Sequence, residues 1–150
     1  MASGIKVDQR CIEAFSDLKT KKEKSNRPFA ICFKIDQNDT IIVVDKIYKR
    51  PTGDATQESA FRLLVEELPC DDGRYVAVDL CVDAAAGETK TDRIVLLVWA
   101  PDSAPIKKKM LYSSSLRNLM EELKAKDHIQ ANDKSDLTYS EMMSKLSKRK

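Results

Sequence analysis

The sequence predicts a single-domain α/β fold in which one mixed β-sheet is sandwiched between helices. Two nearly continuous apolar runs, Tyr75 to Val82 and Ile94 to Trp99, are typical of central strands that are covered on both faces. Segments with helical spacing of apolar residues alternate with pairs of predicted strands, and one sheet between helices is the simplest packing of such elements. A length of 150 residues fits one domain, so we assign residues 1–150 to it.

The first element is expected to be a helix close to the N-terminus. Its apolar residues follow the i, i+4, i+8, i+11 spacing of one helical face and are Val7, Cys11, Phe15 and Leu18. Asp8 is a candidate N-cap, and a basic stretch from Lys19 to Arg27 follows before Pro28 ends the segment. We expect residues 1–6, ahead of this helix, to be flexible.

A β-hairpin and a second helix are expected next. Two strands, Phe29 to Ile35 and Ile41 to Ile47, are separated by Gln37-Asn38-Asp39, which contains two turn-forming residues. Thr56 is a candidate cap for a helix that ends at Pro69. The apolar stripe of this helix consists of Ala60, Phe61, Leu64, Val65 and Leu68.

The C-terminal part is expected to contain a short strand around Ile129 and a final helix from about Thr138. Thr138 and Glu141 have the spacing of a capping box at the start of that helix. Its apolar side consists of Met142, Met143 and Leu146.

The most informative element is a long helix expected from Pro105 to about Lys126. At about 100° per residue, its core stripe consists of Tyr112, Leu116, Leu119, Met120 and Leu123. Met110 falls on the opposite side and is expected to be exposed, on a face shared with Lys107, Ser114 and Arg117. An exposed methionine on a basic, serine-rich face is typical of a protein-contact surface. A solvated helix face is the alternative interpretation.

Composition excludes several classes of function. A net charge of +2 is too small for binding of nucleic acid by bulk attraction. The longest apolar run, Ile94 to Ala100, is far too short to span a membrane, and the N-terminus has no signal-peptide pattern. We therefore expect a cytoplasmic protein without a transmembrane segment. The four cysteines lack a Cys-x-x-Cys pair and are expected to be free thiols: Cys11, Cys32, Cys70 and Cys81.

The sequence contains no motif for catalysis, for a cofactor or for a metal. His128 is the only histidine, no Gly-x-Ser-x-Gly motif surrounds any serine, and the four glycines are isolated, which excludes phosphate-binding glycine loops. One histidine without a Cys-x-x-Cys pair leaves no zinc-ligand set. We expect no enzyme, no cofactor and no metal site. A cysteine-based enzyme stays open only if one thiol has a lowered pKa.

Taken together, the motifs resemble those of the actin-depolymerising factor/cofilin family along almost the whole chain. The most specific match is Trp99-Ala-Pro-Asp-Ser-Ala-Pro-Ile-Lys-Lys-Lys-Met-Leu-Tyr-Ser-Ser-Ser, similar to the family's link between a central strand and its actin-binding helix. Four further matches occur in the family's order: Met1-Ala-Ser-Gly-Ile-Lys-Val, Phe33-Lys-Ile, Arg74-Tyr-Val-Ala-Val-Asp and Gln130-Ala-Asn. The resemblance implies the family's homology domain, a mixed sheet between pairs of helices.

The resemblance also implies a function. Family members bind actin monomers and filament sides, prefer ADP-actin, and sever and depolymerise filaments. By position, the surface for monomers and filaments would consist of Ser3, Gly4, Ile5, Lys107, Lys109 and Met110. The surface used only on filaments would consist of Lys90, Arg93, Lys145 and Lys148. A monomeric protein that touches two neighbouring actin subunits can then strain the contact between them.

Regulation and location follow from the same resemblance. Ser3 is the implied phosphorylation site, and a phosphate there would add about −1.5 to −2 charge. Acidic phosphoinositides are expected to compete for the lysines. The actin cytoskeleton is the expected location, and the basic stretch from Lys19 to Arg27 indicates the nucleus as a second one.

Three positions depart from the family pattern. Asp127 stands where several vertebrate members have a pH-sensing histidine, and His128 follows one position later. Ser144 and Thr91 replace residues that are charged in some members. A filament-side binder or branch-junction regulator without severing activity is therefore kept as an alternative, as is a phosphoinositide-binding adaptor.

Overall fold

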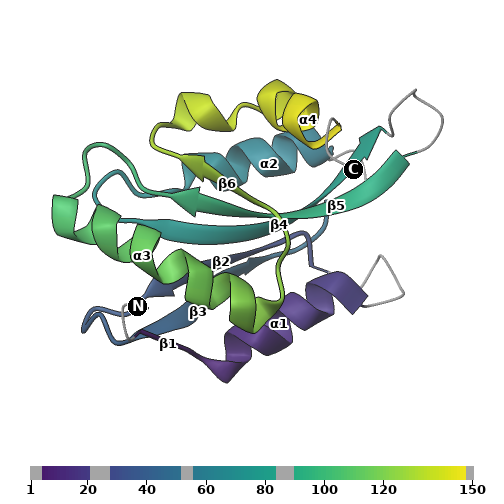
Figure 1. The fold of residues 1–150 in the computed structure, drawn as a ribbon. Coiled ribbons are helices and arrows are strands. Elements are labelled where there is room, and N and C mark those ends of the chain that lie inside the picture. Colours follow the sequence, from purple (N-terminus) through teal and green to yellow (C-terminus); the bar gives the residue numbers. More distant parts are fainter. Residues whose placement is uncertain (1–4, 21–27, 52–55, 84–89, 148–150) are drawn as a thin grey trace.

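The computed structural model describes residues 5–20, 28–51, 56–83 and 90–147, which form one six-stranded sheet and the helices packed on it (Figure 1). The strands are β1 (Lys6–Val7), β2 (Ala30–Ile35), β3 (Ile41–Tyr48), β4 (Arg74–Asp83), β5 (Lys90–Trp99) and β6 (His128–Ala131). The strand order is β1-β3-β2-β4-β5-β6. The outer pairs, β1 with β3 and β5 with β6, are parallel, and the inner pairs are antiparallel. The sheet is therefore mixed, as predicted.

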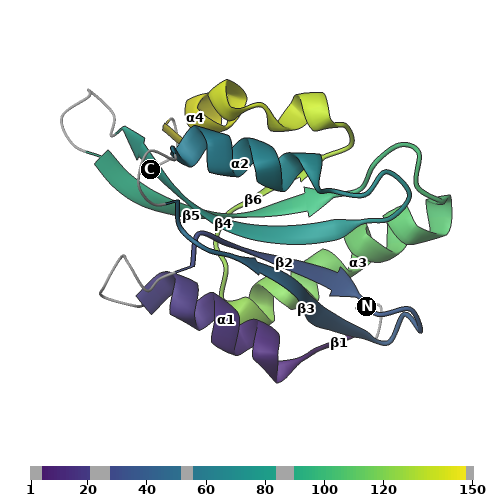
Figure 2. The ribbon, with the colours of Figure 1, turned by 180° about the vertical axis from the view of Figure 1, so that it is seen from behind.

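Helices cover both faces of this sheet. They are α1 (Gln9–Thr20), α2 (Gln57–Glu66), α3 (Ile106–Leu123), the short 3-10 helix η2 (Lys134–Leu137) and α4 (Tyr139–Ser147). Helices α1 and α3 lie on one face, and α2 and α4 lie on the other (Figures 1 and 2). The predicted α/β architecture is confirmed.

The central strands supply both hydrophobic cores. Along β4, Tyr75 and Ala77 pack with α1 and α3, whereas Val76 and Val78 pack with α2 and α4. Alternate side chains of a strand point to opposite faces, so a strand covered on both sides is apolar along most of its length. This explains why the run from Tyr75 to Val82 predicted a central strand.

Capping and turn residues in the sequence predicted the start of α2 and the β2–β3 hairpin correctly. Thr56 caps α2: its Oγ1 accepts a hydrogen bond from the Ser59 N–H at 3.0 Å. The predicted hairpin is formed by β2 and β3, and a carboxylate oxygen of Asp36 accepts the Thr40 N–H at 2.7 Å in its turn. Met142 and Leu146 are buried on the inner side of α4, as expected.

The N-terminal segment differs from the flexible terminus expected for residues 1–6. Ile5 is buried, and Lys6 and Val7 form β1 beside Ile41 and Ile42 of β3. The Lys6 N–H donates to the Thr40 carbonyl at 3.1 Å, and Asn118 of α3 donates to the Ile5 carbonyl at 2.8 Å. These contacts fix residues 5 and 6, whereas residues 1–4 lie outside the described part of the chain.

Helix α3 ends at Leu123, three residues before the end that the pattern predicted. Lys124 takes a left-handed conformation (φ 60°, ψ 38°), which ends the helix, and the Ala125 N–H then donates to the Met120 carbonyl at 3.0 Å. Most left-handed helix ends carry glycine, so a lysine there gives no signal in the sequence.

Candidate protein-binding surface

The start of α3 presents apolar side chains to solvent. Ile106 is 71% exposed and Met110 is 66% exposed, and their i, i+4 spacing puts them on one face. Pro105 precedes the helix without a side-chain cap, and the first turn has no acidic residue. Nothing in this turn offsets the positive end of the helix dipole, so an acidic partner would be favoured there.

The three lysines of this turn point in different directions. Lys107 is exposed. The Lys108 ammonium is 3.1 Å from a carboxylate oxygen of Asp39 in the β2–β3 turn, so it is used within the fold. Lys109 is half-buried, and its Nζ donates to the Asp102 carbonyl at 3.5 Å. Lys107 is therefore the one exposed lysine of the three, and the assignment of Lys107 and Lys109 to a binding surface stays a prediction.

A buried tyrosine pair fixes α3 on the sheet. The rings of Tyr75 and Tyr112 lie 5.0 Å apart, and the Ile35 N–H donates to the Tyr112 hydroxyl at 2.9 Å. Burial raises the pKa of Tyr112 to about 12. A Cβ on Gly73 would lie only 2.4 Å from Cδ2 of Tyr112, so the ring rests directly on the glycine backbone. The exposed face of α3 is thus held in a defined orientation.

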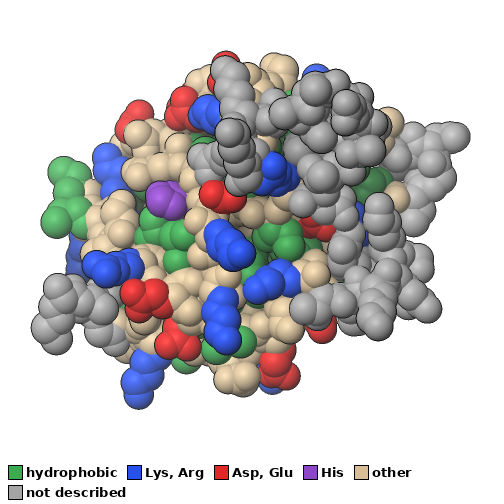
Figure 3. Space-filling view, turned by 45° about the vertical axis from the view of Figure 1, so that its right-hand side comes forward, with side chains coloured by type: hydrophobic (Ala, Val, Ile, Leu, Met, Phe, Trp, Pro, Cys, Tyr) green, Lys and Arg blue, Asp and Glu red, His purple; other side chains and the backbone are tan. Residues whose placement is uncertain are grey.

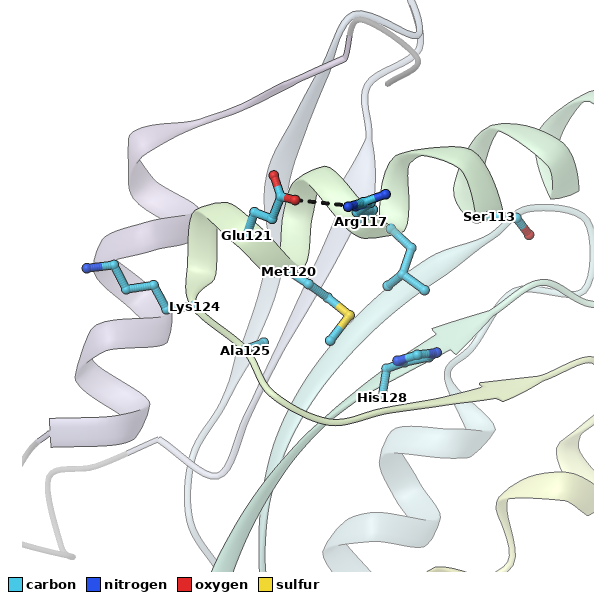
Figure 4. A pocket seen from close by; sticks show the side chains of 8 residues that line it. Ser113, Arg117, Met120, Glu121, Lys124, Ala125 and His128 are labelled. Carbon is cyan, nitrogen blue, oxygen red and sulfur yellow. Dashed lines mark ion pairs between the residues drawn. The ribbon is translucent and has the colours of Figure 1, made fainter. Parts of the chain in front are cut away.

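An open groove lies between the C-terminal half of α3 and β6. It has a volume of about 590 Å³ and is lined by Ser113, Leu116, Arg117, Met120, Glu121, Lys124, Ala125 and His128. Met120 points from α3 toward β6, where His128 lies (Figure 4). The predicted core stripe is therefore correct at Tyr112, Leu119 and Leu123, whereas Leu116 and Met120 are only half-buried and line the groove.

The residues expected to contact filaments only are spread over two elements. Arg93 is half-buried on β5 and lines a cavity of about 290 Å³ together with Lys19, Lys124 and Lys126. Lys145 is exposed on α4. The end of α4 and the start of β5 lie at the same end of the molecule (Figures 1 and 2). The side chain of Lys90, and all of Lys148, lie outside the described residues.

The side chain of Gln57 connects α2 to β4 and to α4. The Gln57 side chain accepts the Cys81 N–H at 2.8 Å and donates to the Cys81 carbonyl at 3.1 Å. Its Nε2 also donates to the Tyr139 hydroxyl at 2.7 Å. The start of α2 is therefore joined to β4 and to the start of α4, the helix that carries Lys145.

The buried cysteines do not support thiol chemistry. Burial, with the charge of Asp8, raises the pKa of Cys11 to about 12. Burial, with the charge of Asp45, raises the pKa of Cys32 to about 12. A nucleophilic cysteine needs a lowered pKa, so both thiols stay protonated at neutral pH.

In the described ranges of the chain, no cluster of three or more His, Cys, Asp or Glu side chains could hold a metal ion. No helix in those ranges has the length and apolar character needed to cross a membrane.

Comparison with known proteins decides the family. The model of the family described as "Cofilin/tropomyosin-type actin-binding protein" matches residues 4–147. The chain belongs to this family. Actin-depolymerizing factor 2, isoform c, of Caenorhabditis elegans is 36% identical over 152 residues, which cover 97% of this chain and 96% of that protein. The cofilin of Schizosaccharomyces pombe is 33% identical over 148 residues and 98% of each chain.

A solved cofilin structure agrees with the fold. The crystal structure of Streptomyces griseoflavus cofilin has a TM-score of 0.78 and 28% identity, and the match covers 98% of this chain and all of that one. The resemblance to the actin-depolymerising factor/cofilin family is therefore confirmed. Within this cofilin-type chain, the site residues named from the sequence stay predictions.

The structure brings only some of these predicted site residues together. Ile5 lies next to α3, but its side chain is buried, so it anchors the N-terminal segment and does not face a partner. Ser3 and Gly4 lie outside the described residues. Sequence reasoning missed Ile106, although its i, i+4 spacing from Met110 was a usable signal. It also missed Asn118 and the groove, which depend on contacts between distant segments.

Proposed function

We propose that this protein binds actin monomers and the sides of actin filaments, and that it depolymerises filaments. The observation that carries the proposal is the start of α3, where Ile106 and Met110 are exposed beside Lys107 on a helix end without a cap or an acidic residue. Membership of an actin-binding family supports actin as the partner. Its relative in C. elegans is named an actin-depolymerizing factor.

Two separate surfaces are proposed for the two forms of actin. The monomer-and-filament surface consists of Ser3, Gly4, Lys107, Lys109 and Met110; Ile5, which the sequence placed in this set, is buried and serves as the anchor of the segment. The filament-only surface consists of Lys90, Arg93, Lys145 and Lys148. Support comes from the exposed positions of these side chains. Lys107 and Met110 lie on α3, and Lys145 lies on α4 in the opposite layer.

Severing would follow from differential binding. A protein that contacts two neighbouring subunits stabilises the filament state that fits both surfaces, and the strain weakens the contact between the subunits. ADP-actin is the preferred form in this proposal. A filament-side binder or branch-junction regulator without severing remains the second candidate. The half-buried position of Arg93 favours the lack of severing, because a smaller contact at the second surface would strain the contact between subunits less.

Regulation is proposed at two places. A phosphate on Ser3 would add negative charge two residues before Ile5, whose carbonyl accepts a hydrogen bond from Asn118 of α3. Acidic phosphoinositides would compete with actin through basic residues, and the cavity that Arg93 shares with Lys19, Lys124 and Lys126 supports this. The actin cytoskeleton is the proposed location, with the nucleus as a second one.

High-speed sedimentation of actin filaments with this protein tests the proposal. We expect the protein to pellet with filaments while additional actin appears in the supernatant. If the protein pellets without releasing actin, the second candidate is correct. If it never pellets and the actin distribution is unchanged, actin binding is refuted, and binding to phosphoinositide vesicles becomes the next measurement.

A further inference from the structure

The first turns of α3 are packed less tightly against the sheet than the rest of the helix. No side chain from Ile106 to Leu111 is buried, and Leu111, which packs against the core, is only half-buried. The buried positions begin at Tyr112. Figure 3 shows hydrophobic side chains that project from the left-hand end of the molecule, where α3 begins in Figure 1. Most helix stability comes from packing, so a polar contact has a larger effect on position at this start.

Helix α3 has polar contacts at three points along its length to β1, β2 and the turn between β2 and β3. From the end of the helix to its start, these contacts join Asn118 to the Ile5 carbonyl, Tyr112 to the Ile35 N–H, and Lys108 to Asp39. The outer two points are ten residues apart, which is about 15 Å along the helix axis. Together they set the direction of the helix relative to the sheet.

The contact at the start of α3 comes from a turn that also holds β1. Asp39 has a left-handed backbone (φ 56°), and its N–H donates to the Asp36 carbonyl at 2.9 Å. Its carboxylate lies 3.1 Å from the Lys108 ammonium, and the two side chains are 27% and 29% exposed. The carbonyl of the next residue, Thr40, accepts the Lys6 N–H. Adjacent residues of one turn therefore contact β1 and the start of α3, which lie at the same end of the molecule (Figures 1 and 2).

The carboxylate of Asp39 offsets an unfavourable charge pattern in α3. The first turns contain three consecutive lysines, and the first turn has no acidic residue. Positive charge at a helix N-terminus opposes the helix dipole. Without Asp39, Lys108 would lose its ion-pair partner between two other lysines. Because the pair is partly buried, salt screens it less than a fully exposed pair.

We infer that Asp39 is a positioning residue for actin binding. By pairing with Lys108, it holds the first turns of α3 at a fixed angle to the sheet and in a fixed place relative to β1. Glycine would fit the left-handed backbone of residue 39 without strain, but only an acidic side chain pairs with Lys108. The effect on actin rests on the proposed function, whereas the effect on the helix start is measured in the free protein.

Site-resolved amide hydrogen exchange of Asp39→Asn tests the positioning without actin. Asparagine has nearly the same shape and tolerates the left-handed backbone, so the substitution removes the charge alone. The Lys109 N–H, which donates to the Pro105 carbonyl at 3.1 Å, reports on the first turn. We expect its exchange to become about fivefold faster, while exchange of the Leu119 N–H stays within about twofold of the wild type.

Titration of fluorescently labelled ADP-actin monomers tests the effect on binding. We expect Asp39→Asn and Lys108→Met each to weaken the affinity about threefold to fivefold. The double variant should lose no more than either single variant, because both residues act through one contact. Asp71→Asn is the matched control, since Asp71 is exposed in the loop between α2 and β4. It should leave exchange at Lys109 and actin affinity within about twofold of the wild type.

The outcomes separate this inference from the proposed function. If the wild type does not bind actin, the proposed function fails, and the role of Asp39 in actin binding fails with it. If the wild type binds actin and Asp39→Asn leaves exchange at Lys109 unchanged, the inference alone is wrong. An equal rise of exchange throughout α3 would show a general loss of stability and would also overturn it. So would faster exchange at Lys109 with unchanged actin affinity, or losses of affinity that add in the double variant.

Discussion

At the scale of single residues, Tyr112 connects the sheet to the helix that carries the proposed actin surface. Its ring fills the space against Gly73 and packs on Tyr75, and its hydroxyl accepts the Ile35 N–H. All of these groups are buried, so no water replaces a contact that is lost. The hydroxyl therefore contributes to stability as well as to the position of α3.

We expect Tyr112→Phe to lower the free energy of unfolding by about 1–3 kcal/mol, the cost of leaving the buried Ile35 N–H without an acceptor. Urea unfolding measures this change. Tyr48→Phe is the matched control, because the Tyr48 hydroxyl meets the exposed Glu67 at 3.2 Å, and it should change stability by less than about 0.5 kcal/mol. Equal effects of the two substitutions would contradict the assigned role of Tyr112.

Asp36 gives a prediction for pH. Hydrogen bonds from the Thr40 N–H, and then from the Ile41 N–H, hold the pKa of this carboxyl below its ordinary value of 3.8. A carboxyl with a lower pKa in the folded state stabilises the fold above its unfolded-state pKa, and this is lost as pH falls through the folded value. We expect Asp36→Asn to lower the thermal midpoint at pH 7, with a difference from the wild type that narrows below about pH 4. A difference that is constant with pH would refute this.

At the scale of elements, β4 continues past the first residue of β2, and its free side there needs another partner. The pairing of these strands stops at Ala30 and Val78, and the Asp79 N–H then donates to the Phe29 carbonyl. Beyond that point the amide of Gln57 takes the place of a strand at Cys81. The same amide reaches Tyr139, so α4 is positioned by a contact that starts on α2.

We expect Gln57→Leu to lower the free energy of unfolding by about 1–3 kcal/mol, because the peptide groups of Cys81 lose their partner. It should also weaken filament binding more than monomer binding, because α4 carries Lys145. Urea unfolding, co-sedimentation and monomer titration measure the three quantities. Tyr139→Phe removes only the contact to α4 and should change filament binding in the same direction. Equal loss of monomer and filament affinity would count against this positioning role.

The elements that were predicted correctly are those whose signal lies within a single segment of the chain. Central strands, amphipathic helices and the cap at Thr56 each depend on residues within one segment, so periodicity and spacing reveal them. Strand β1 has only two residues and exists because Lys6 and Val7 pair with a strand 35 residues away, which no local pattern can show.

For the candidate site, too, features of a single helix could be predicted, whereas features that depend on two distant segments could not. Exposure of Met110 followed from the helical wheel, because the opposite stripe is buried. The wheel also placed Leu116 and Met120 in the core, but β6 leaves a groove there, and the width of that groove depends on how two distant segments pack. The ion pair between half-buried Arg50 and buried Asp79 was missed because it also joins distant segments.

At the scale of the whole molecule, the proposed surfaces belong to opposite layers. Lys107 and Met110 lie on α3, which packs with α1, whereas Lys145 lies on α4, which packs with α2 on the other face of the sheet. A rigid sheet between them lets one molecule hold two partners in a fixed relative orientation. The central claim is therefore that the two surfaces act separately.

The most direct test compares two double variants in monomer titration and in filament co-sedimentation. We expect Lys107→Ala with Lys109→Ala to weaken binding to both monomers and filaments. We expect Lys145→Ala with Lys148→Ala to weaken filament binding about tenfold while monomer affinity stays within about twofold of the wild type. If both pairs reduce both affinities to the same extent, the protein has one actin surface and the account is wrong.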